Sequence, residues 1–207
     1  MGDGLDAVLL RARERGFLGP GDPASHRVHA LAFAEAYEAL EGGPPSACCD
    51  LGSGGGMPGL VLATRWPGTS VSLLEASARR CDFLREAIGA LGVGATTSVC
   101  EGRAEALART PGLEGRFGLV TARSFGRPGV TAECAARLLE PGGVLLVGEP
   151  PSGEVADRWP TTELAVLGLG TAVMVSLAPH LVAIRRVGRC PDRYPRRNGV
   201  PSKRPLF

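Results

Sequence analysis

Glycine dominates one short stretch of this 207-residue sequence, where residues 48–63 read CCDLGSGGGMPGLVLA. An apolar, strand-like run leads into a segment with five glycines between positions 52 and 59, and a helix-like run follows. Glycine lets the backbone approach a ligand closely, and the N-terminus of a helix attracts anionic groups. The stretch is therefore typical of a loop that holds a dinucleotide, a phosphate or a related ligand.

Two ligand-binding motifs compete for these glycines. Residues 54–59 match the G-x-G-x-x-G motif of dinucleotide-binding proteins, whereas residues 50–56 match the acidic-x-G-x-G-x-G loop of S-adenosylmethionine (SAM) methyltransferases. The apolar run stops at Leu51, and Pro58 suits the first turn of the next helix, so the turn begins at Gly52. This placement favours SAM, because the dinucleotide register would begin its glycines too late. The G-K-[ST] sequence of a triphosphate-binding loop is absent.

The alternation of short β-like runs with amphipathic runs indicates the fold class. Five strand-like runs are each followed by a helix-like run, which predicts a parallel sheet with helices on both faces. Two further β-like runs are joined by Ala-Pro, a connection too tight for a crossover helix, and predict an antiparallel hairpin at the end of the sheet. The expected strands are 47–51, 70–75, 95–100, 117–122, 143–148, 171–177 and 180–187, and the helices between them are 57–65, 77–91, 102–109, 128–139 and 153–168.

The chain divides into three segments of one compact domain. Helical patterns at 5–16 and 25–41 form a short N-terminal helical segment over residues 1–42. The SAM-binding domain is expected over 43–187. Residues 188–207 contain four prolines and no periodicity, which predicts an irregular tail.

Charge is distributed unevenly between the body and the tail. Residues 1–184 carry 15 arginines against 20 acidic residues, whereas residues 185–207 carry eight basic residues against Asp192. A basic tail can follow a phosphate backbone, extend into solvent, or fold against the acidic body.

Cysteine usage and hydropathy bear on the compartment. The six cysteines form no C-x-x-C pair, which is typical of free thiols in a reducing environment. The longest apolar run, residues 164–178, is well short of a membrane span, and the N-terminal apolar stretch is too short for a signal peptide. We therefore expect a cytoplasmic protein that does not contact a membrane.

Acidic residues follow the second and third expected strands, at the sheet edge where ligands of such folds bind. Glu75 can accept hydrogen bonds from both ribose hydroxyls of SAM, or it can be a carboxylate at the start of the next helix. Glu101 and Glu105 lie near the position that usually contacts adenine, or they are charges on a helix face.

Methyl transfer from a sulfonium requires alignment of the acceptor and exclusion of water more than it requires acid or base chemistry. Cysteine chemistry would require a Cys on the loop after the fourth or fifth expected strand, and neither loop contains one. His26, His29 and His180 are expected in packing or on the surface, so that no metal site is predicted. The acceptor is then an atom with a free lone pair, such as a ring nitrogen.

Together these motifs resemble the RsmG (GidB) family, which methylates N7 of a guanine in 16S rRNA. The resemblance extends from about residue 29 to the C-terminus and rests on DLGSGGGMPGLVLA, LLEASARRCDFLREAIGALG, GRAEAL, VTARSFG and RYPRRNGVPSKRPL. It implies a class I SAM-dependent methyltransferase fold with a Rossmann-like sheet, SAM as cofactor, and 16S rRNA or the small ribosomal subunit as partner.

The resemblance and the residue types together indicate which residues form the candidate site. The expected cofactor-binding residues are Asp50, Gly52, Ser53, Gly54, Gly56, Glu75, Ala104 and Glu105. The expected catalytic residues are Arg123, at the mouth of the active site, and Ser124. The expected substrate-binding residues are Glu149, Tyr194, Arg196, Arg197, Lys203 and Arg204, with the tyrosine available to stack a base.

Some positions depart from the family pattern. Ala32 and Phe33 replace an Asp-Ser pair, and Glu149 stands where a lysine aligns, which reverses a charge at the face expected to meet RNA. A carboxylate there opposes a phosphate backbone. The alternatives are therefore a divergent paralogue that methylates a small molecule or another nucleotide, and a non-catalytic RNA-binding module.

Overall fold

The apolar runs of the sequence form the strands of a single sheet in the computed structural model, which describes residues 2–19, 21–151 and 154–207. The strands are β1 (Ala47–Leu51), β2 (Ser70–Glu75), β3 (Thr97–Glu101), β4 (Phe117–Arg123), β5 (Leu139–Gly148), β6 (Val173–Leu177) and β7 (His180–Arg185). The helices are α1 (Gly2–Glu14), α2 (Pro23–Glu41), α3 (Gly59–Arg65), α4 (Ala78–Leu91), α5 (Ala104–Leu107), α6 (Pro128–Ala136), α7 (Val155–Arg158), α8 (Thr161–Val166) and α9 (Val200–Lys203).

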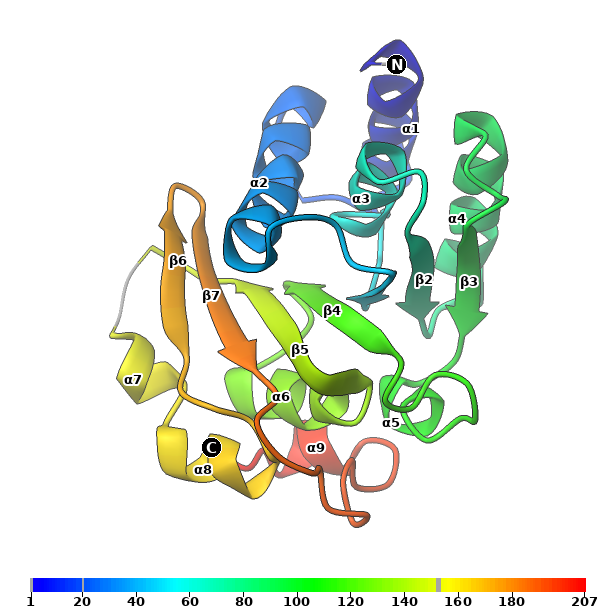
Figure 1. Ribbon diagram of the computed structural model, residues 1–207. Helices are drawn as coiled ribbons and strands as arrows, with labels where there is room; N and C mark the ends of the chain where they lie inside the picture. The colour runs from blue at the N-terminus through cyan, green and yellow to red at the C-terminus, as the bar shows by residue number, and fades with distance from the viewer. Residues whose placement is uncertain (1, 20, 152–153) are drawn as a thin grey trace.

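The strand order is β3-β2-β1-β4-β5-β7-β6, with parallel pairing from β3 through to β5. β7 pairs antiparallel with both β5 and β6. The parallel sheet that ends in an antiparallel hairpin is therefore confirmed, with the second strand of the hairpin inserted next to β5 (Figure 1).

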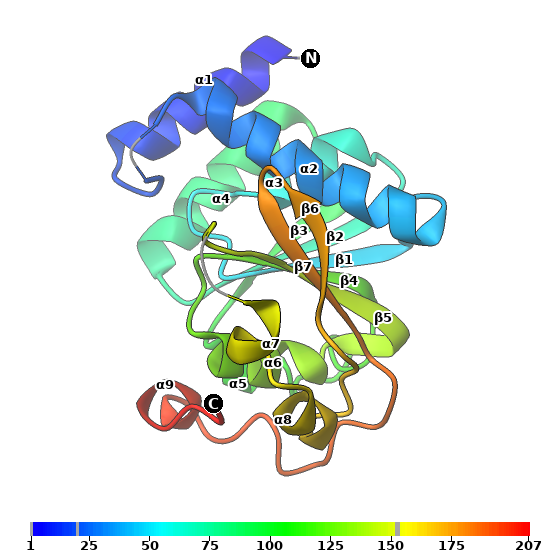
Figure 2. The same cartoon turned by 90° about the vertical axis from the view of Figure 1, so that its left-hand side faces the viewer.

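Helices cover both faces of the sheet, with α1–α4 on one face and α5–α9 on the other (Figure 2). β1 is buried along its whole length, as expected for the central strand of a parallel sheet. Because side chains alternate along a strand, Cys48 packs in the core beneath α2, α3 and α4, and Cys49 packs in the core on the α6 side. The sheet thus separates two hydrophobic cores.

Of the helix expected over residues 153–168, residue 153 lies outside the described residues, and the rest contains two short helices, α7 and α8, instead of one. Pro160 precedes α8 and has no N–H to continue the hydrogen bonds of α7. Trp159, between the two helices, is buried, and its ring meets the Phe207 ring edge-on with 6.4 Å between centroids. The break therefore places a large aromatic side chain in the core and fixes the end of α7.

Within the described ranges, no helix has both the length and the apolar character needed to cross a bilayer, and no three potential metal ligands gather. The six cysteines are free thiols.

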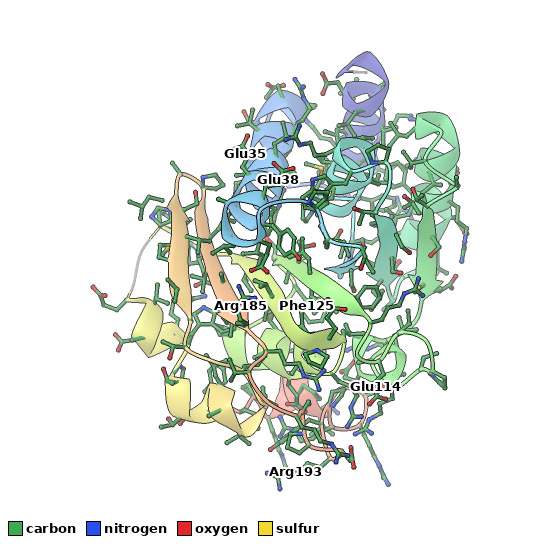
Figure 3. All side chains as sticks on the ribbon, in the orientation of Figure 1. Glu35, Glu38, Glu114, Phe125, Arg185 and Arg193 are labelled. Atoms are coloured by element: carbon green, nitrogen blue, oxygen red, sulfur yellow. The ribbon has the colours of Figure 1, made fainter. Side chains whose placement is uncertain are left out.

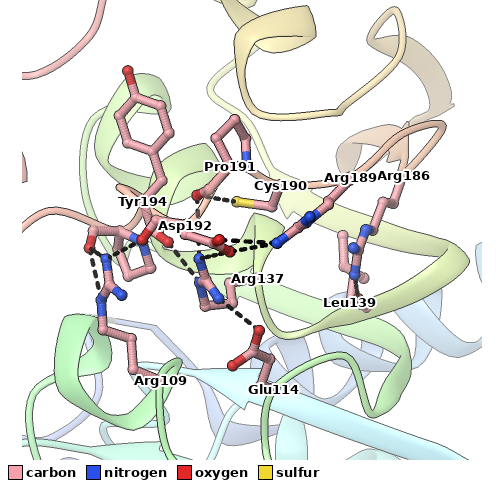
Figure 4. Close-up of polar contacts among 11 residues, drawn as sticks. Arg109, Glu114, Arg137, Leu139, Arg186, Arg189, Cys190, Pro191, Asp192 and Tyr194 are labelled. Atoms are coloured by element: carbon pink, nitrogen blue, oxygen red, sulfur yellow. Dashed lines mark hydrogen bonds and ion pairs between the residues drawn. The ribbon is translucent and has the colours of Figure 1, made fainter.

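The tail beyond β7 is folded onto the α6 side of the molecule. Arg137 donates one hydrogen bond to the Tyr194 carbonyl at 2.6 Å and another to the Pro191 carbonyl at 3.1 Å, and it also pairs with Glu114 (Figure 4). A Cβ at Gly129 of α6 would lie 2.8 Å from the Phe207 carbonyl oxygen, which shows how closely the two segments approach. Of the three arrangements open from the sequence, the structure has the tail folded against the body.

A buried ion pair fastens this tail. Glu133 of α6 is fully buried, and its carboxylate accepts hydrogen bonds from Nε and Nη2 of Arg196 at 2.9 and 2.6 Å. The backbone N–H of Arg196 donates to the same carboxylate at 2.7 Å. Such a fork-shaped pair is geometrically specific, and removal of one partner leaves a buried charge.

Replacing Arg196 with alanine is expected to lower the free energy of unfolding by about 3 kcal/mol, because it leaves the Glu133 carboxylate buried and unpaired. Arg197 is exposed, so Arg197→Ala, the matched control, should change stability by less than about 0.5 kcal/mol. Urea unfolding followed by circular dichroism measures both. Equal, small effects would contradict the docked tail.

Candidate active site

Asp50 joins three segments of the fold. Its Oδ2 accepts a hydrogen bond from the Gly59 N–H at the start of α3, and its Oδ1 accepts one from the Thr121 hydroxyl of β4, each at 3.0 Å. Burial raises the pKa of this carboxyl to about 6, although the hydrogen bonds from Thr121 and Gly59 favour its ionised form. Asp50 therefore positions the glycine loop from inside the protein. Ser53 also bonds inward, because its hydroxyl donates to the Asp50 carbonyl at 3.0 Å.

The loop needs glycine for two separate reasons. The N–H groups of Gly52 and Ser53 both donate to the Leu74 carbonyl at 2.9 Å, which folds the loop back onto β2. Gly52 has a φ of +75°, and a Cβ there would lie only 2.5 Å from Cδ2 of Phe125. Gly56 has a φ of +91° and is equally crowded by a leucine of α3. Positive φ and close packing together exclude larger residues.

Glu75 at the end of β2 is a carboxylate at the start of the next helix, one of the two roles open to it from the sequence. Its Oε2 accepts the N–H of Gly54 in the glycine loop, and its Oε1 accepts the N–H groups of Ala76 and Ser77 before α4, all at 2.9 Å. The carboxylate is largely buried, yet it lines a cavity beside the loop.

That cavity has a volume of about 570 Å³ and lies beyond the carboxyl ends of β2 and β3. Leu74, Ala104 and Val130 give it apolar walls, while Gly52 and Glu75 supply bare backbone and a carboxylate. Cofactor sites commonly have this size and this combination of apolar walls with few polar groups. We call it the first cavity.

The tail completes the first cavity. Glu105, expected near adenine, accepts a hydrogen bond from the Gly199 N–H at 2.8 Å and one from Arg103 at 3.4 Å. Burial raises the pKa of Glu105, but the Gly199 hydrogen bond and the Arg103 charge outweigh it and hold the pKa below its usual value. Glu105 thus fastens α9, which brings Ser202 and Lys203 to the cavity wall.

A second cavity, of about 590 Å³, adjoins the first. Both are lined by Ser124, Phe125 and Gly126, which follow β4. Ser124 has a φ of +55° and is the one non-glycine residue with positive φ in the described ranges. A left-handed residue of this kind costs energy and is typical of functional sites. The turn sets the Phe125 ring over Gly52 and between the two cavities.

Arg123 lies on the wall of the second cavity and is held by His26 of α2. Its Nη2 lies 2.9 Å from Nδ1 of His26, whose Nε2 lies 3.2 Å from the Gly19 carbonyl. Nε2 therefore carries the proton and Nδ1 accepts from the guanidinium. Burial lowers the pKa of Arg123, and Asp50 opposes this. The Nη1 group of Arg123 and Nδ1 of His29 are buried with no hydrogen-bond partner.

Glu149 lines the second cavity, but its carboxylate is not free. Its side chain is 6% exposed and pairs with Nε of Arg158, and its backbone N–H donates to the His180 carbonyl at 2.9 Å. The charge reversal expected at this position is thus compensated by a nearby arginine. Phe33, the other departure from the family pattern, is fully buried in the core.

The structure divides the expected substrate-binding residues of the tail. Tyr194 is only 8% exposed, so its ring lies within the protein, which corrects the expectation that it stacks a base. Arg196 is held by the α6 carboxylate described above. Arg197, Lys203 and Arg204 are exposed.

The exposed basic residues of the tail, Arg197, Lys203 and Arg204, follow β7 in the segment that is folded onto the α6 side of the molecule. Figure 3 shows Arg193 of the tail at the opposite end of the molecule from Glu35 and Glu38 of α2.

Comparison with known proteins identifies the family. The model of the GidB family, described as rRNA small subunit methyltransferase G, matches residues 22–158. The chain belongs to this family.

Relatives agree with this assignment. Ribosomal RNA small subunit methyltransferase G of Pelotomaculum thermopropionicum is 34% identical over 164 residues, which cover 76% of this chain and 68% of that protein. The enzyme of the same name from Symbiobacterium thermophilum is 37% identical over 191 residues, which cover 86% and 77% of the two chains.

Solved structures agree on the fold. An O-methyltransferase of Bacillus cereus, in complex with SAH, aligns with a TM-score of 0.64 at 18% identity over 90% of this chain and 91% of that one. TomG of Streptomyces achromogenes, in complex with SAM, aligns with a TM-score of 0.61 at 16% identity over 91% of each chain. This GidB-family protein has the class I methyltransferase fold and is a SAM-dependent methyltransferase.

The residues of the first cavity fit the cofactor. A SAM molecule needs an acceptor for its ribose hydroxyls, an apolar slot for adenine and an unobstructed backbone, and the Glu75 carboxylate, the apolar walls and Gly52 offer these features.

Sequence reasoning did not place His26, His29, Phe125 or Arg158 in the site, although all line the second cavity. The i, i+3 spacing of the two histidines does put them on one face of α2, but nothing local indicates which element faces them. Phe125 lies within the VTARSFG motif and could have been included. Arg158 falls in a segment expected to be a weak helix, where its side chain had no predicted partner.

Glu75→Ala is expected to weaken SAM binding about 10- to 100-fold, because it removes a charged hydrogen-bond acceptor and frees three loop N–H groups. Glu101, its register partner on β3, is exposed and pairs with Arg85, so Glu101→Ala is the matched control and should leave the Kd unchanged. Isothermal titration calorimetry measures both. Equal losses would argue against a specific contact at Glu75.

Proposed function

We propose that this methyltransferase transfers the methyl group of SAM to N7 of a guanine in 16S rRNA. The names of the relatives support rRNA of the small ribosomal subunit as the acceptor. The observation that carries the proposal is the second cavity, which meets the first at Ser124, Phe125 and Gly126 and contains two guanidinium groups.

In this proposal SAM occupies the first cavity. Glu75 accepts hydrogen bonds from the ribose, Gly52 and Gly54 let the backbone approach the ligand, and Ala104 lines the adenine slot. Asp50 and Ser53, expected as direct contacts, act through the loop they position. Glu105 acts through α9, because its carboxylate is engaged by the tail.

The acceptor chemistry follows from the groups available. Bound SAM supplies a methyl group already activated on a sulfonium. Guanine N7 has an in-plane lone pair and no proton, so the reaction needs orientation and exclusion of water rather than a base. In the described part of the chain, no cysteine lines the second cavity, and burial raises the pKa of the Cys134 thiol in the first, so neither offers a thiolate nucleophile.

Arg123, Ser124 and Phe125 orient the acceptor in this proposal. The Phe125 ring offers a flat apolar face at the junction of the cavities, on which a purine can stack. Arg123 lines the same cavity and brings a guanidinium charge to the acceptor nucleotide. Ser124 holds the strained turn that places these two side chains.

The Glu149 carboxylate does not oppose an RNA acceptor in this proposal, because Arg158 compensates its charge. With Arg123 also present, the second cavity has an excess of positive charge, which suits an RNA acceptor.

The acceptor is tested by mass spectrometry of 16S rRNA nucleosides from cells with and without the gene. Cells that lack it should lose one 7-methylguanosine, and the purified protein with labelled SAM should restore it to naked 16S rRNA or to 30S subunits. Arg123→Ala should abolish the transfer and leave SAM binding intact. Identical nucleosides in both strains would refute the rRNA assignment.

The exposed tail cations should bind the phosphate backbone. Arg197→Gln/Arg204→Gln is expected to weaken rRNA binding and to reduce the slope of log K against log [salt] by about 1.5, since each lost phosphate contact contributes about 0.7 to 0.9. Arg11→Gln/Arg13→Gln on α1 removes the same charge from exposed positions on the other face and should leave the slope unchanged. Filter binding at salt concentrations from 50 to 200 mM measures both slopes. Over this range a protein with about six phosphate contacts loses much of its affinity for RNA. Equal effects of the two double variants would contradict a specific tail surface.

A further inference from the structure

The ion pair between Glu149 and Arg158 lies on the wall of the second cavity, and its two side chains differ in exposure. The glutamate side chain is 6% exposed and the arginine side chain is 36% exposed. The carboxylate is therefore buried behind the guanidinium, and the guanidinium remains accessible to a ligand in the cavity.

The backbone of Arg158 is fixed from both sides. Its N–H donates to the Glu154 carbonyl at 3.3 Å, and the N–H of Trp159 donates to the Val155 carbonyl at 2.8 Å. Trp159 is buried and meets Phe207 of the tail edge-on. Arg158 is thus anchored by a core residue immediately after it, and Glu149 is anchored at the end of β5 by its bond to His180.

The cavity has more donors than the protein satisfies. Glu149 accepts from Nε of Arg158, which leaves the two Nη groups of that guanidinium for a ligand. Arg123 lines the same cavity and adds a second guanidinium charge, while its unpartnered Nη1 group is itself buried. Two guanidinium groups against one carboxylate leave an excess of one positive charge, so the matching ligand is an anion rich in acceptor oxygens.

We propose that Arg158, oriented by Glu149, binds a phosphate group of the acceptor nucleotide in the second cavity together with Arg123. A guanidinium matches the oxygens of phosphate with two parallel hydrogen bonds, and Glu149 is the positioning residue that sets its plane. The inference rests on the proposed function for the identity of the nucleotide. Beyond the proposed function, it specifies that the cavity binds the phosphate of the nucleotide and that Arg158, a residue outside the family motifs, binds this phosphate.

Guanosine 5′-monophosphate and guanosine are the probes, because they differ only in the phosphate. For the wild-type protein with SAH bound, calorimetry should give a Kd for the monophosphate about tenfold below that for guanosine, as expected for one charge-assisted contact. Glu149→Gln/Arg158→Gln removes both charges without leaving one buried, and it should abolish this preference. The double variant should bind SAM as the wild type does, because neither residue lines the first cavity.

Glu149→Gln alone separates binding from a purely structural role. This variant keeps an oxygen for Arg158 but removes the compensating charge, so it should strengthen binding of the monophosphate by about three- to tenfold. If the pair were only structural, the single and double variants would change binding in the same direction. Glu38→Gln/Arg65→Gln, which neutralises a pair joined at 3.0 Å outside both cavities, is the control and should change neither affinity.

Steady-state transfer to 16S rRNA gives the second measurement. The Glu149/Arg158 double variant should raise the KM for rRNA about tenfold and change kcat by less than threefold, since the contact forms before transfer. Equal binding of the two probes by the wild type, undetectable binding of the monophosphate, or an unchanged KM in the double variant would overturn the inference. Binding of the monophosphate through Arg158 without any transfer to rRNA would refute the proposed acceptor and leave this site standing.

Discussion

The buried carboxylate of Asp50 ties the end of β1 to the start of α3 and to β4, and both cavities depend on that tie. The glycine loop runs between Asp50 and Gly59, so its ends are held by one hydrogen bond of 3.0 Å. Thr121, bonded to the other carboxylate oxygen, lies two residues before Arg123, whose charged form the Asp50 charge favours. A carboxylate removed from water requires its donors, because each unmet bond costs about 1 to 3 kcal/mol. The same residue therefore sets the loop of the first cavity and the strand end that reaches the second.

The two cavities meet at a turn of only a few residues after β4. Ser124 takes up the left-handed conformation there, and Phe125 lies across Gly52, where any Cβ would strike its ring. Position 52 therefore requires glycine partly because the Phe125 ring lies against it. In the proposed reaction the methyl group passes from cofactor to acceptor at this junction, which is a short turn at the end of a buried strand rather than part of a long loop. The strain at Ser124 is consistent with a position that must be held within a fraction of an ångström.

Local sequence signals predicted those parts of the molecule whose cause is local. The burial of β1, the start of the turn at Gly52 and the place of Glu75 at a strand end all follow from runs of a few residues. The contacts that the sequence could not predict join distant positions: Arg196 binds a carboxylate 63 positions away, and Gly199 binds one 94 positions away. The Arg123 contact to His26 spans 97 positions. Short stretches of sequence, taken one at a time, contain no information on such pairs. The basic composition of the tail fits a solvent-exposed arm as well as a docked one.

The docking of the tail also implies an order of folding during synthesis, in which the sheet forms before the tail packs against it. The segment that supplies Ser202 and Lys203 to the first cavity follows all strands of the sheet in the chain, so a growing polypeptide builds the sheet before this wall exists. A ligand stabilises only the conformations that bind it. The emerging sheet therefore buries its two cores first, and the wall that Ser202 and Lys203 give to the first cavity is added only when the tail has folded against α6.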